Sequence, residues 1–227
     1  MKTAILFKDT LFVAPLKSGT RTLRAYIGYA SNKSLLDSHQ DNKYPAKATT
    51  ESRKFTYYIS SHYEYDTEGV ENYNKLYKEN LFYRDFEKNR PELELKTKIL
   101  MLRDPVSRFI SAYSMMRTNL QKNWTIQEFI DNFDRLMWEY DHHKRHFIPM
   151  TYGIGLNPAW YTHIYTIKQI DEIKKHIEQL CGYELPSIHA NQGHNIAEIN
   201  SGLTPEQIDW IKQRYIIDYR VYGKYFS

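Results

Sequence analysis

The stretch from Thr10 to Tyr26 restricts the possible folds of this chain most strongly. It opens with an apolar run that is typical of a buried strand, which we expect to cover Leu11–Leu16. A turn of small and basic residues follows, and apolar residues then recur at helical spacing. The turn reads Lys17-Ser18-Gly19-Thr20-Arg21-Thr22. The stretch therefore predicts a strand, a tight turn and the start of a helix.

The turn has the chemistry of an anion-binding site. Backbone N–H groups at a helix start lack intrahelical partners, and the helix dipole favours negative charge there. Gly19 allows a phosphate to approach the backbone, and Lys17 adds a point charge. Hydroxyl donors come from Ser18, Thr20 and Thr22. A Walker A loop is excluded because its lysine follows the second glycine. On its own, such a run more often marks an ordinary turn.

A second stretch, Lys98–Tyr113, repeats the strand-to-helix pattern far downstream. Its apolar run predicts a strand over Lys98–Leu102, and Pro105 suits the first position of the following helix. Arg103 then lies at the C-terminal end of that strand, with Ser111 on the helix. Because ligands of open α/β sheets bind at the carboxyl ends of strands, we expect Arg103 and the Lys17 turn to share one edge.

Together the two motifs resemble the cofactor-binding elements of sulfotransferases that use PAPS (3′-phosphoadenosine 5′-phosphosulfate). The run from Lys17 to Leu23 is similar to the 5′-phosphosulfate loop of that family. Arg103-Asp104-Pro105 with Ser111 is similar to its 3′-phosphate site. The better match is to the carbohydrate branch, which includes the heparan sulfate O-sulfotransferases. The resemblance implies PAPS as cofactor, PAP as product, no metal, and a glycan or other hydroxyl compound as acceptor.

The resemblance also implies residues on the acceptor side. A base that takes the acceptor proton speeds transfer, and histidine is the natural candidate. His62 follows a predicted strand in a turn that resembles the catalytic-histidine turn of heparan sulfate 2-O- and 6-O-sulfotransferases, so we expect His62 and Lys17 to be catalytic. A surface histidine bonded to Glu64 or Asp66, or a carboxylate base, stays open. His146–Met150 resembles an H-x-x-P-Q acceptor element, with Met150 replacing the glutamine.

The rest of the chain is typical of a single enzyme domain over residues 1–227. Further strands are expected at 55–60 and 162–167. Helices are expected at 20–31, 70–89, 105–120, from 125, at 171–180 and at 205–218. This alternation predicts an α/β fold with three layers, in which helices flank a central parallel sheet. The resemblance implies the P-loop nucleotide-binding type.

Composition excludes several classes of function. The net charge of +4 is spread along the chain, which does not suggest a nucleic-acid partner. No apolar run reaches the ~20 residues of a membrane span, so we expect a soluble, cytoplasmic protein, although removal of an N-terminal anchor stays open. Cys181 is the only cysteine, which excludes an internal disulfide. Two other functions stay open: a small-molecule kinase, and a non-catalytic module of the same fold that binds nucleotide or glycan.

Overall fold

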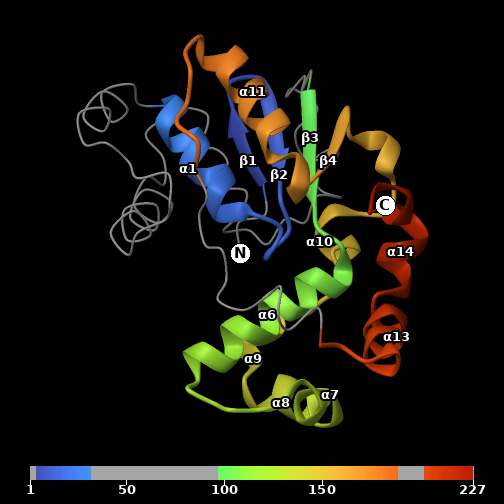
Figure 1. The fold of residues 1–227 in the computed structure, drawn as a ribbon. Helices are drawn as coiled ribbons and strands as arrows, with labels where there is room; N and C mark the ends of the chain where they lie inside the picture. The colour runs from blue at the N-terminus through green and yellow to red at the C-terminus, as the bar shows by residue number, and fades with distance from the viewer. Residues whose placement is uncertain (1–3, 32–96, 189–201, 227) are drawn as a thin grey trace.

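Four strands form one sheet, and Figure 1 shows them in the upper half of the molecule. The computed structural model describes residues 4–31, 97–188 and 202–226. The strands in sheet order are β1 (Ala4–Phe7), β2 (Thr10–Val13), β3 (Thr97–Leu102) and β4 (His163–Thr166). β2, β3 and β4 run parallel, with Val13 beside Leu100 and Leu102 beside Thr166. Their carboxyl ends therefore meet at one edge of the sheet.

The first strand of the sheet corrects the sequence prediction. β1 was not predicted, and it pairs antiparallel with β2, so the sheet is not wholly parallel. A turn at Lys8 and Asp9 joins the two strands, and Lys8 has a φ of 53°. This turn lacks the Asn-Gly pair that marks most two-residue hairpins, which explains the missed strand. The strand expected over Leu11–Leu16 begins at Thr10 and ends at Val13.

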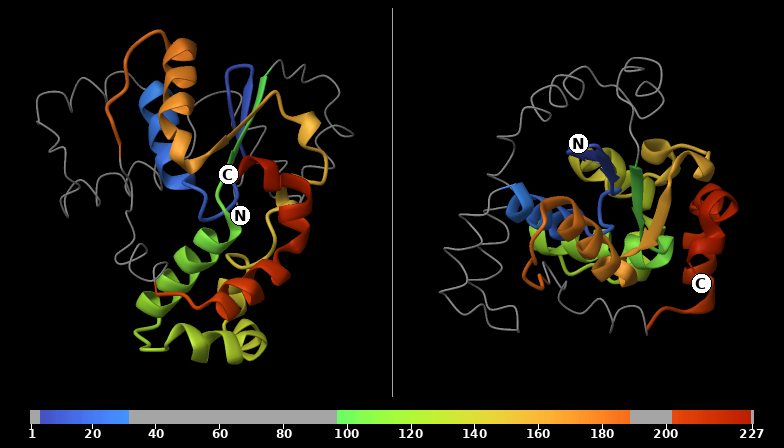
Figure 2. Two further views of the ribbon diagram at one scale, coloured as in Figure 1. Left: turned by 45° about the vertical axis from the view of Figure 1, so that its right-hand side comes forward. Right: turned by 90° about the horizontal axis from the view of Figure 1, so that it is seen from above.

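Helices cover both faces of the sheet. α1 (Thr20–Ser31) and α11 (Ile170–Cys181) lie side by side on one face, as Figures 1 and 2 show. Phe12, Ile99 and Met101 pack into the core on that face. The opposite core holds the alternate strand residues and side chains from α10 (Thr151–Ile154) and α14 (Ile216–Tyr222). Because strand side chains alternate, both faces are apolar, and the prediction of an α/β fold with flanked parallel strands is confirmed.

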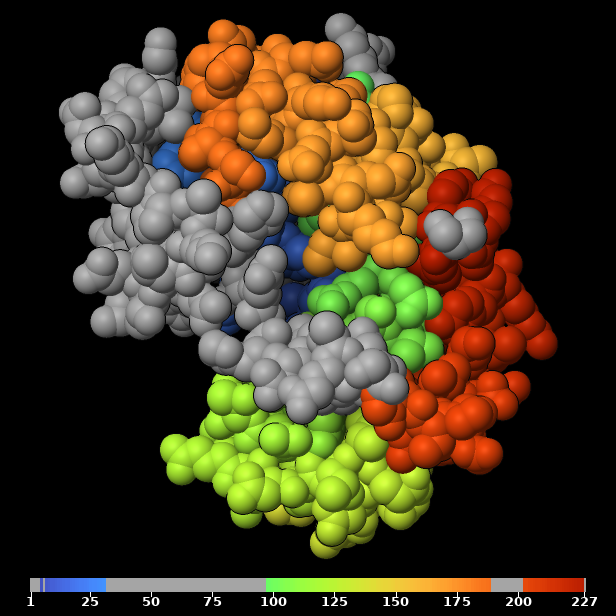
Figure 3. Space-filling view, in the orientation of Figure 1, coloured from blue at the N-terminus to red at the C-terminus, as the bar shows by residue number. Residues whose placement is uncertain are grey.

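A second group of helices packs at the carboxyl edge of the sheet. α6 (Pro105–Asn119) leads away from β3, and Figure 3 shows part of its green surface between the sheet region and the lower helices. The remaining helices of this group are α7 (Ile126–Asp131), α8 (Phe133–Glu139), α9 (Asp141–Lys144) and α13 (Pro205–Arg214). Their shared core is rich in aromatic rings, and Phe109 lies 5.5 Å from Phe147 between ring centroids.

Several helix ends follow from local sequence. Asp104 caps α6 and Pro105 takes its first position, while Thr204 forms a capping box at the start of α13. Gly182, with a φ of 83°, ends α11, close to the predicted end of that helix at residue 180. The last predicted helix is instead broken at Tyr215, because that residue leaves helical geometry with φ −107° and ψ 24°.

Residues 141–158 follow Tyr140 in a stretch that the sequence suggests to be a loop with Pro149 and Gly155, but they contain the short helices α9 and α10. Single 3₁₀ turns occur at Pro158–Trp160, Ile167–Gln169 and Gly223–Tyr225. The predicted strand at 55–60 and helix at 70–89 lie outside the described residues. Within the described ranges, no helix has the length and apolar character needed to cross a membrane.

Candidate active site

The loop between β2 and α1 is folded tightly by its own backbone. Ser18 N–H donates to the Pro15 carbonyl at 3.1 Å, and Leu23 N–H donates to the Gly19 carbonyl at 3.1 Å. The second bond is the first of α1, so the N–H groups of residues 20–22 precede it at the positive end of the helix. The Thr20 hydroxyl turns back and donates to the Pro15 carbonyl at 3.0 Å. The loop thus presents a helix start at the carboxyl edge of the sheet.

Two residues of this loop have a left-handed backbone. Gly19 has a φ of 83°, and a Cβ there would lie 3.0 Å from Met101 Cε and 3.3 Å from Ile167 Cδ1. The ends of β3 and β4 therefore approach this glycine closely. Lys17 has a φ of 70°, which costs a residue with a side chain about 1–2 kcal/mol. The surroundings of Lys17 must hold it in this conformation.

Two arginines hold the backbone around Lys17. Arg103 Nη1 donates to the Lys17 carbonyl at 3.1 Å, and Arg108 Nε donates to the Leu16 carbonyl at 3.0 Å. Arg103 directly follows β3, and Arg108 lies one turn into α6. The expectation that Arg103 and the Lys17 turn meet at one sheet edge is therefore confirmed.

The site is strongly positive. Burial, and then the charges of Arg21, Arg103 and Arg108, lower the pKa of Lys17 to about 8. Burial also lowers the pKa of Arg103, an effect that the nearby Asp104 opposes and Arg108 reinforces. Cations that repel one another at a helix N-terminus are suited to a multiply charged anion, which would offset their repulsion.

Both carboxylate oxygens of Asp104 accept hydrogen bonds that stabilise the fold around α6. One carboxylate oxygen accepts from Ser107 N–H at 2.9 Å, and the other accepts from the Tyr219 hydroxyl at 2.9 Å. Among the described residues, no hydrogen bond or ion pair joins Asp104 to Arg103. The Lys17 carbonyl is thus the partner that the described chain gives Arg103.

The other predicted cofactor residues differ in accessibility. Ser18 is fully buried, and its hydroxyl points to Met150 Sδ at 3.8 Å. Thr22 and Ser111 are each 8% exposed, on α1 and α6 respectively, whereas Arg21 is exposed. His62 lies outside the described residues, so its position relative to Lys17 stays a prediction.

His146 lies close enough to the loop to respond to its charge. Burial, and then the charges of Lys17, Arg145, His143 and Arg108, lower the pKa of His146 to about 3. The ring is therefore neutral, and its buried Nδ1 has no hydrogen-bond partner in the part of the chain that the structure describes. Such a weak base takes up a proton poorly, but it can accept a hydrogen bond from a hydroxyl.

The neighbouring histidines do not form a metal centre in the described chain. The rings of His142 and His143 lie 4.0 Å apart, and those of His143 and His146 lie 6.3 Å apart, between centroids. No group of three or more histidine, cysteine, aspartate or glutamate residues suited to a metal ion occurs within residues 4–31, 97–188 and 202–226.

Three buried polar residues near the loop were missed by the sequence interpretation: Arg108, Tyr215 and Asp218. Arg108 shares the buried face of α6 with Phe109 and Ala112. A lone arginine on an apolar face was one signal, and its place between Arg103 and Ser111 in the motif that resembles the 3′-phosphate site was another. Tyr215 and Asp218 offered none, because the groups that they bond lie 68 residues away along the chain.

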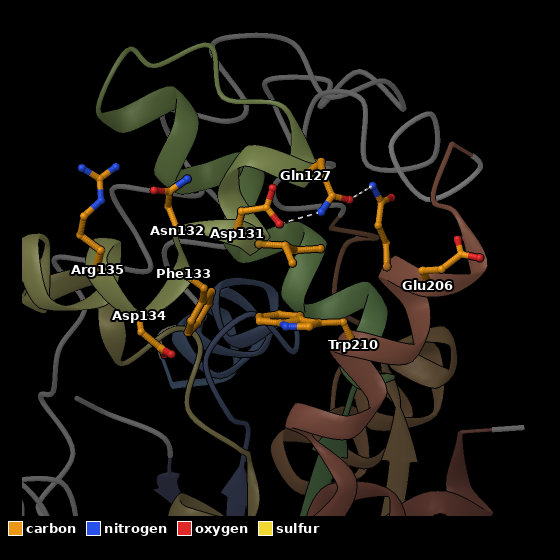
Figure 4. A pocket seen from close by; sticks show the side chains of 10 residues that line it. Gln127, Asp131, Asn132, Phe133, Asp134, Arg135, Glu206 and Trp210 are labelled. Carbon is orange, nitrogen blue, oxygen red and sulfur yellow. Dashed lines mark hydrogen bonds between the residues drawn. The ribbon is translucent and has the colours of Figure 1, made fainter.

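Two surface hollows lie apart from the loop. Figure 4 shows the first, of about 530 Å³, where Gln127, Asp131, Phe133 and Trp210 line a space between α7, α8 and α13. Dashed lines in that view include the bond from Gln127 Nε2 to Asp131 Oδ1, at 2.8 Å. The second hollow, of about 1040 Å³, is lined partly by residues 147–149. Neither hollow is lined by a predicted cofactor residue. The candidate site is therefore identified by its charge and hydrogen bonds and not by a hollow.

Comparison with known families gives one match. The model of the sulfotransferase family matches residues 17–226, which include the loop, Arg103, Ser111 and His146. Comparisons with curated proteins and with solved structures gave no significant match. The family match covers nearly the whole chain and begins at Lys17 itself. The chain therefore belongs to the sulfotransferase family.

Proposed function

We propose that this sulfotransferase takes a sulfuryl group from PAPS and transfers it to an acceptor hydroxyl, expected on a saccharide. One observation carries the proposal: the bond from Arg103 to the Lys17 carbonyl joins the two predicted phosphate-binding motifs at one sheet edge. Burial and nearby positive charge lower the pKa values of both Lys17 and Arg103, which supports an anionic ligand there. The strand, loop and helix start would then act as a P-loop type of nucleotide site.

Each group would have a distinct task. The N–H groups at the start of α1, with Lys17, would bind the 5′-phosphosulfate, and Arg103 with Ser111 would bind the 3′-phosphate. The bond between sulfur and the 5′-phosphate oxygen breaks as the acceptor oxygen bonds to sulfur. Lys17 would stabilise charge on the departing phosphate of PAP, and a base would receive the acceptor proton.

We assign the base to His62 and an acceptor contact to His146. The depressed pKa of His146, about 3, makes its neutral ring a hydrogen-bond acceptor and a poor proton acceptor at neutral pH. If His62 is the base, kcat falls as pH drops through its pKa, near 6.5 if unperturbed. His62→Ala should remove this acid limb and lower kcat by about 10²-fold or more, with little change in PAP affinity.

The decisive experiment is mass-detected sulfate transfer from PAPS to a panel of glycans and simple alcohols. We expect transfer to at least one saccharide, and Lys17→Ala should slow it far more than it weakens binding of PAP, which lacks the sulfate.

Thermal shift with PAP, ATP or GTP separates the alternatives. Stabilisation by ATP with Mg²⁺ would indicate a kinase, and binding of PAP without transfer to any acceptor would indicate a non-catalytic module.

A further inference from the structure

Arg108 has an unusual set of partners for a buried cation. Its side chain is 1% exposed, and no carboxylate of the described chain lies within ion-pair distance of it. Instead, Nε donates to the Leu16 carbonyl at 3.0 Å and Nη2 donates to the Ile148 carbonyl at 2.8 Å. These carbonyls lie 92 and 40 residues from Arg108 along the chain. One guanidinium thus joins the cofactor loop to the segment that follows His146.

That segment, residues 147–151, is also held from its other side. The Tyr215 hydroxyl donates to the Phe147 carbonyl at 2.6 Å. The Asp218 carboxylate, fully buried, accepts from the N–H groups of Met150 at 2.8 Å and Thr151 at 2.9 Å. Backbone groups of this segment are therefore fixed by side chains from α6 and from the end of the chain. The segment is a rigid support for His146, which precedes it.

In the loop, two arginines donate hydrogen bonds to consecutive backbone carbonyls, one of which belongs to the strained Lys17. Arg108 holds the carbonyl of Leu16, and Arg103 holds the carbonyl of Lys17, whose φ is 70°. A left-handed residue with a side chain persists only where its surroundings fix it. The two arginines supply that constraint and so determine where the Lys17 amine can lie.

We infer that Arg108 is a positioning residue for sulfuryl transfer, because it fixes the Lys17 loop and the segment after His146 relative to each other. The inference rests on the proposed contact of Lys17 with the sulfuryl donor. An arginine is required because its planar fork offers several N–H groups in fixed directions. A lysine at this depth keeps the charge, but its single ammonium cannot span both carbonyls in the same geometry.

The test measures amide exchange and kinetics in the full chain. We expect Arg108→Lys to speed hydrogen–deuterium exchange in both segments, read at the N–H groups of Ser18 and Met150. It should also lower kcat by about 10–100-fold, the effect of a small misplacement of reacting groups, while PAP affinity falls less than kcat. Arg117→Lys is the matched control, because Arg117 is exposed on the same helix and, within the described residues, its recorded hydrogen bond is local, to Tyr113. It should change neither measurement.

A second variant keeps the inference testable if Arg108→Lys does not fold. Tyr215→Phe keeps the ring beside Arg108 but removes the hydroxyl, which bonds both the Phe147 carbonyl and Arg108. It contacts no loop residue that the structure records. If Arg108 joins the two segments, this variant should speed exchange at Ser18 as well as at Met150. Faster exchange at Met150 alone would overturn the inference, as would unchanged kcat in a folded Arg108→Lys. Exchange needs no PAPS, so absence of transfer by the wild type would refute the proposed function and leave this result standing.

Discussion

Replacing Gly19 by alanine tests why a glycine occupies the proposed cofactor loop between β2 and α1. At φ 83° an alanine costs about 1–2 kcal/mol for the left-handed backbone alone. Its Cβ would also lie 3.0 Å from Met101 Cε and 3.3 Å from Ile167 Cδ1, and overpacking of this kind adds about 1–3 kcal/mol. We therefore expect Gly19→Ala to lower the free energy of unfolding by about 2–5 kcal/mol. At ~2–4 °C per kcal/mol for a chain of this size, Tm should fall by roughly 4–20 °C.

Two other glycines serve as matched controls for this variant. Gly182 has the same φ of 83°, but a Cβ added there would have no neighbouring atom within 4 Å. Gly182→Ala therefore measures the backbone cost alone. Gly153, in α10, has neither a left-handed backbone nor a close neighbour, so Gly153→Ala should be neutral or slightly stabilising. Thermal unfolding followed by circular dichroism gives all three values under one set of conditions.

Nucleotide binding provides the second measurement on these variants. If a phosphate approaches the backbone at Gly19, the added methyl group should weaken PAP binding by about 10–100-fold, the value of one charge-assisted hydrogen bond. Gly182→Ala and Gly153→Ala should leave PAP affinity unchanged in calorimetric titrations. An unchanged affinity in folded Gly19→Ala would refute the placement of the anion at this loop. Equal Tm losses in Gly19→Ala and Gly182→Ala would refute the packing argument.

Two further predictions concern the cations of the site. Lys17 is charged only below its pKa of about 8, so kcat/KM for PAPS should fall as pH rises through about 8. Lys17→Arg, which stays charged, should remove this alkaline limb. A flat pH profile for the wild type would show that the reaction does not need the charge of Lys17. Arg103→Ala should reduce the preference for PAP over adenosine 5′-phosphate by about 10–100-fold in calorimetric titrations, whereas Arg117→Ala should not. A retained preference in Arg103→Ala would move the 3′-phosphate elsewhere.

The parts of the fold that the sequence predicted have local causes. The bounds of α1 match the prediction, and the predicted end of α11 and start of α13 lie close to Gly182 and Thr204, because caps depend on residues within one turn. Arg103 was placed beside the Lys17 turn correctly because carboxyl ends of parallel strands share an edge. That argument needed only two apolar runs and the residues that follow them.

The parts that the sequence did not predict depend on distant partners. Tyr215 interrupts the last helix and bonds the Phe147 carbonyl, and nothing in its own neighbourhood signals that break. Arg108 binds two carbonyls that only the folded chain brings together. A backbone carbonyl has the same chemistry at every position, so such a bond leaves no pattern in the sequence. A single domain over residues 1–227 and the role of His62 stay predictions.

The positive charges that suit this loop to an anion also act on stability. An unfolded lysine has a pKa near 10.4, whereas Lys17 in the folded chain has a pKa of about 8. Between these values the unfolded chain binds more protons, so this residue makes stability rise with pH, and below pH 8 its charge opposes folding in full. A bound anion favours the protonated amine and so opposes this effect. The proposed affinity for an anion and the charge repulsion in the free loop therefore have one origin, the gathering of Lys17, Arg103 and Arg108 around a helix N-terminus.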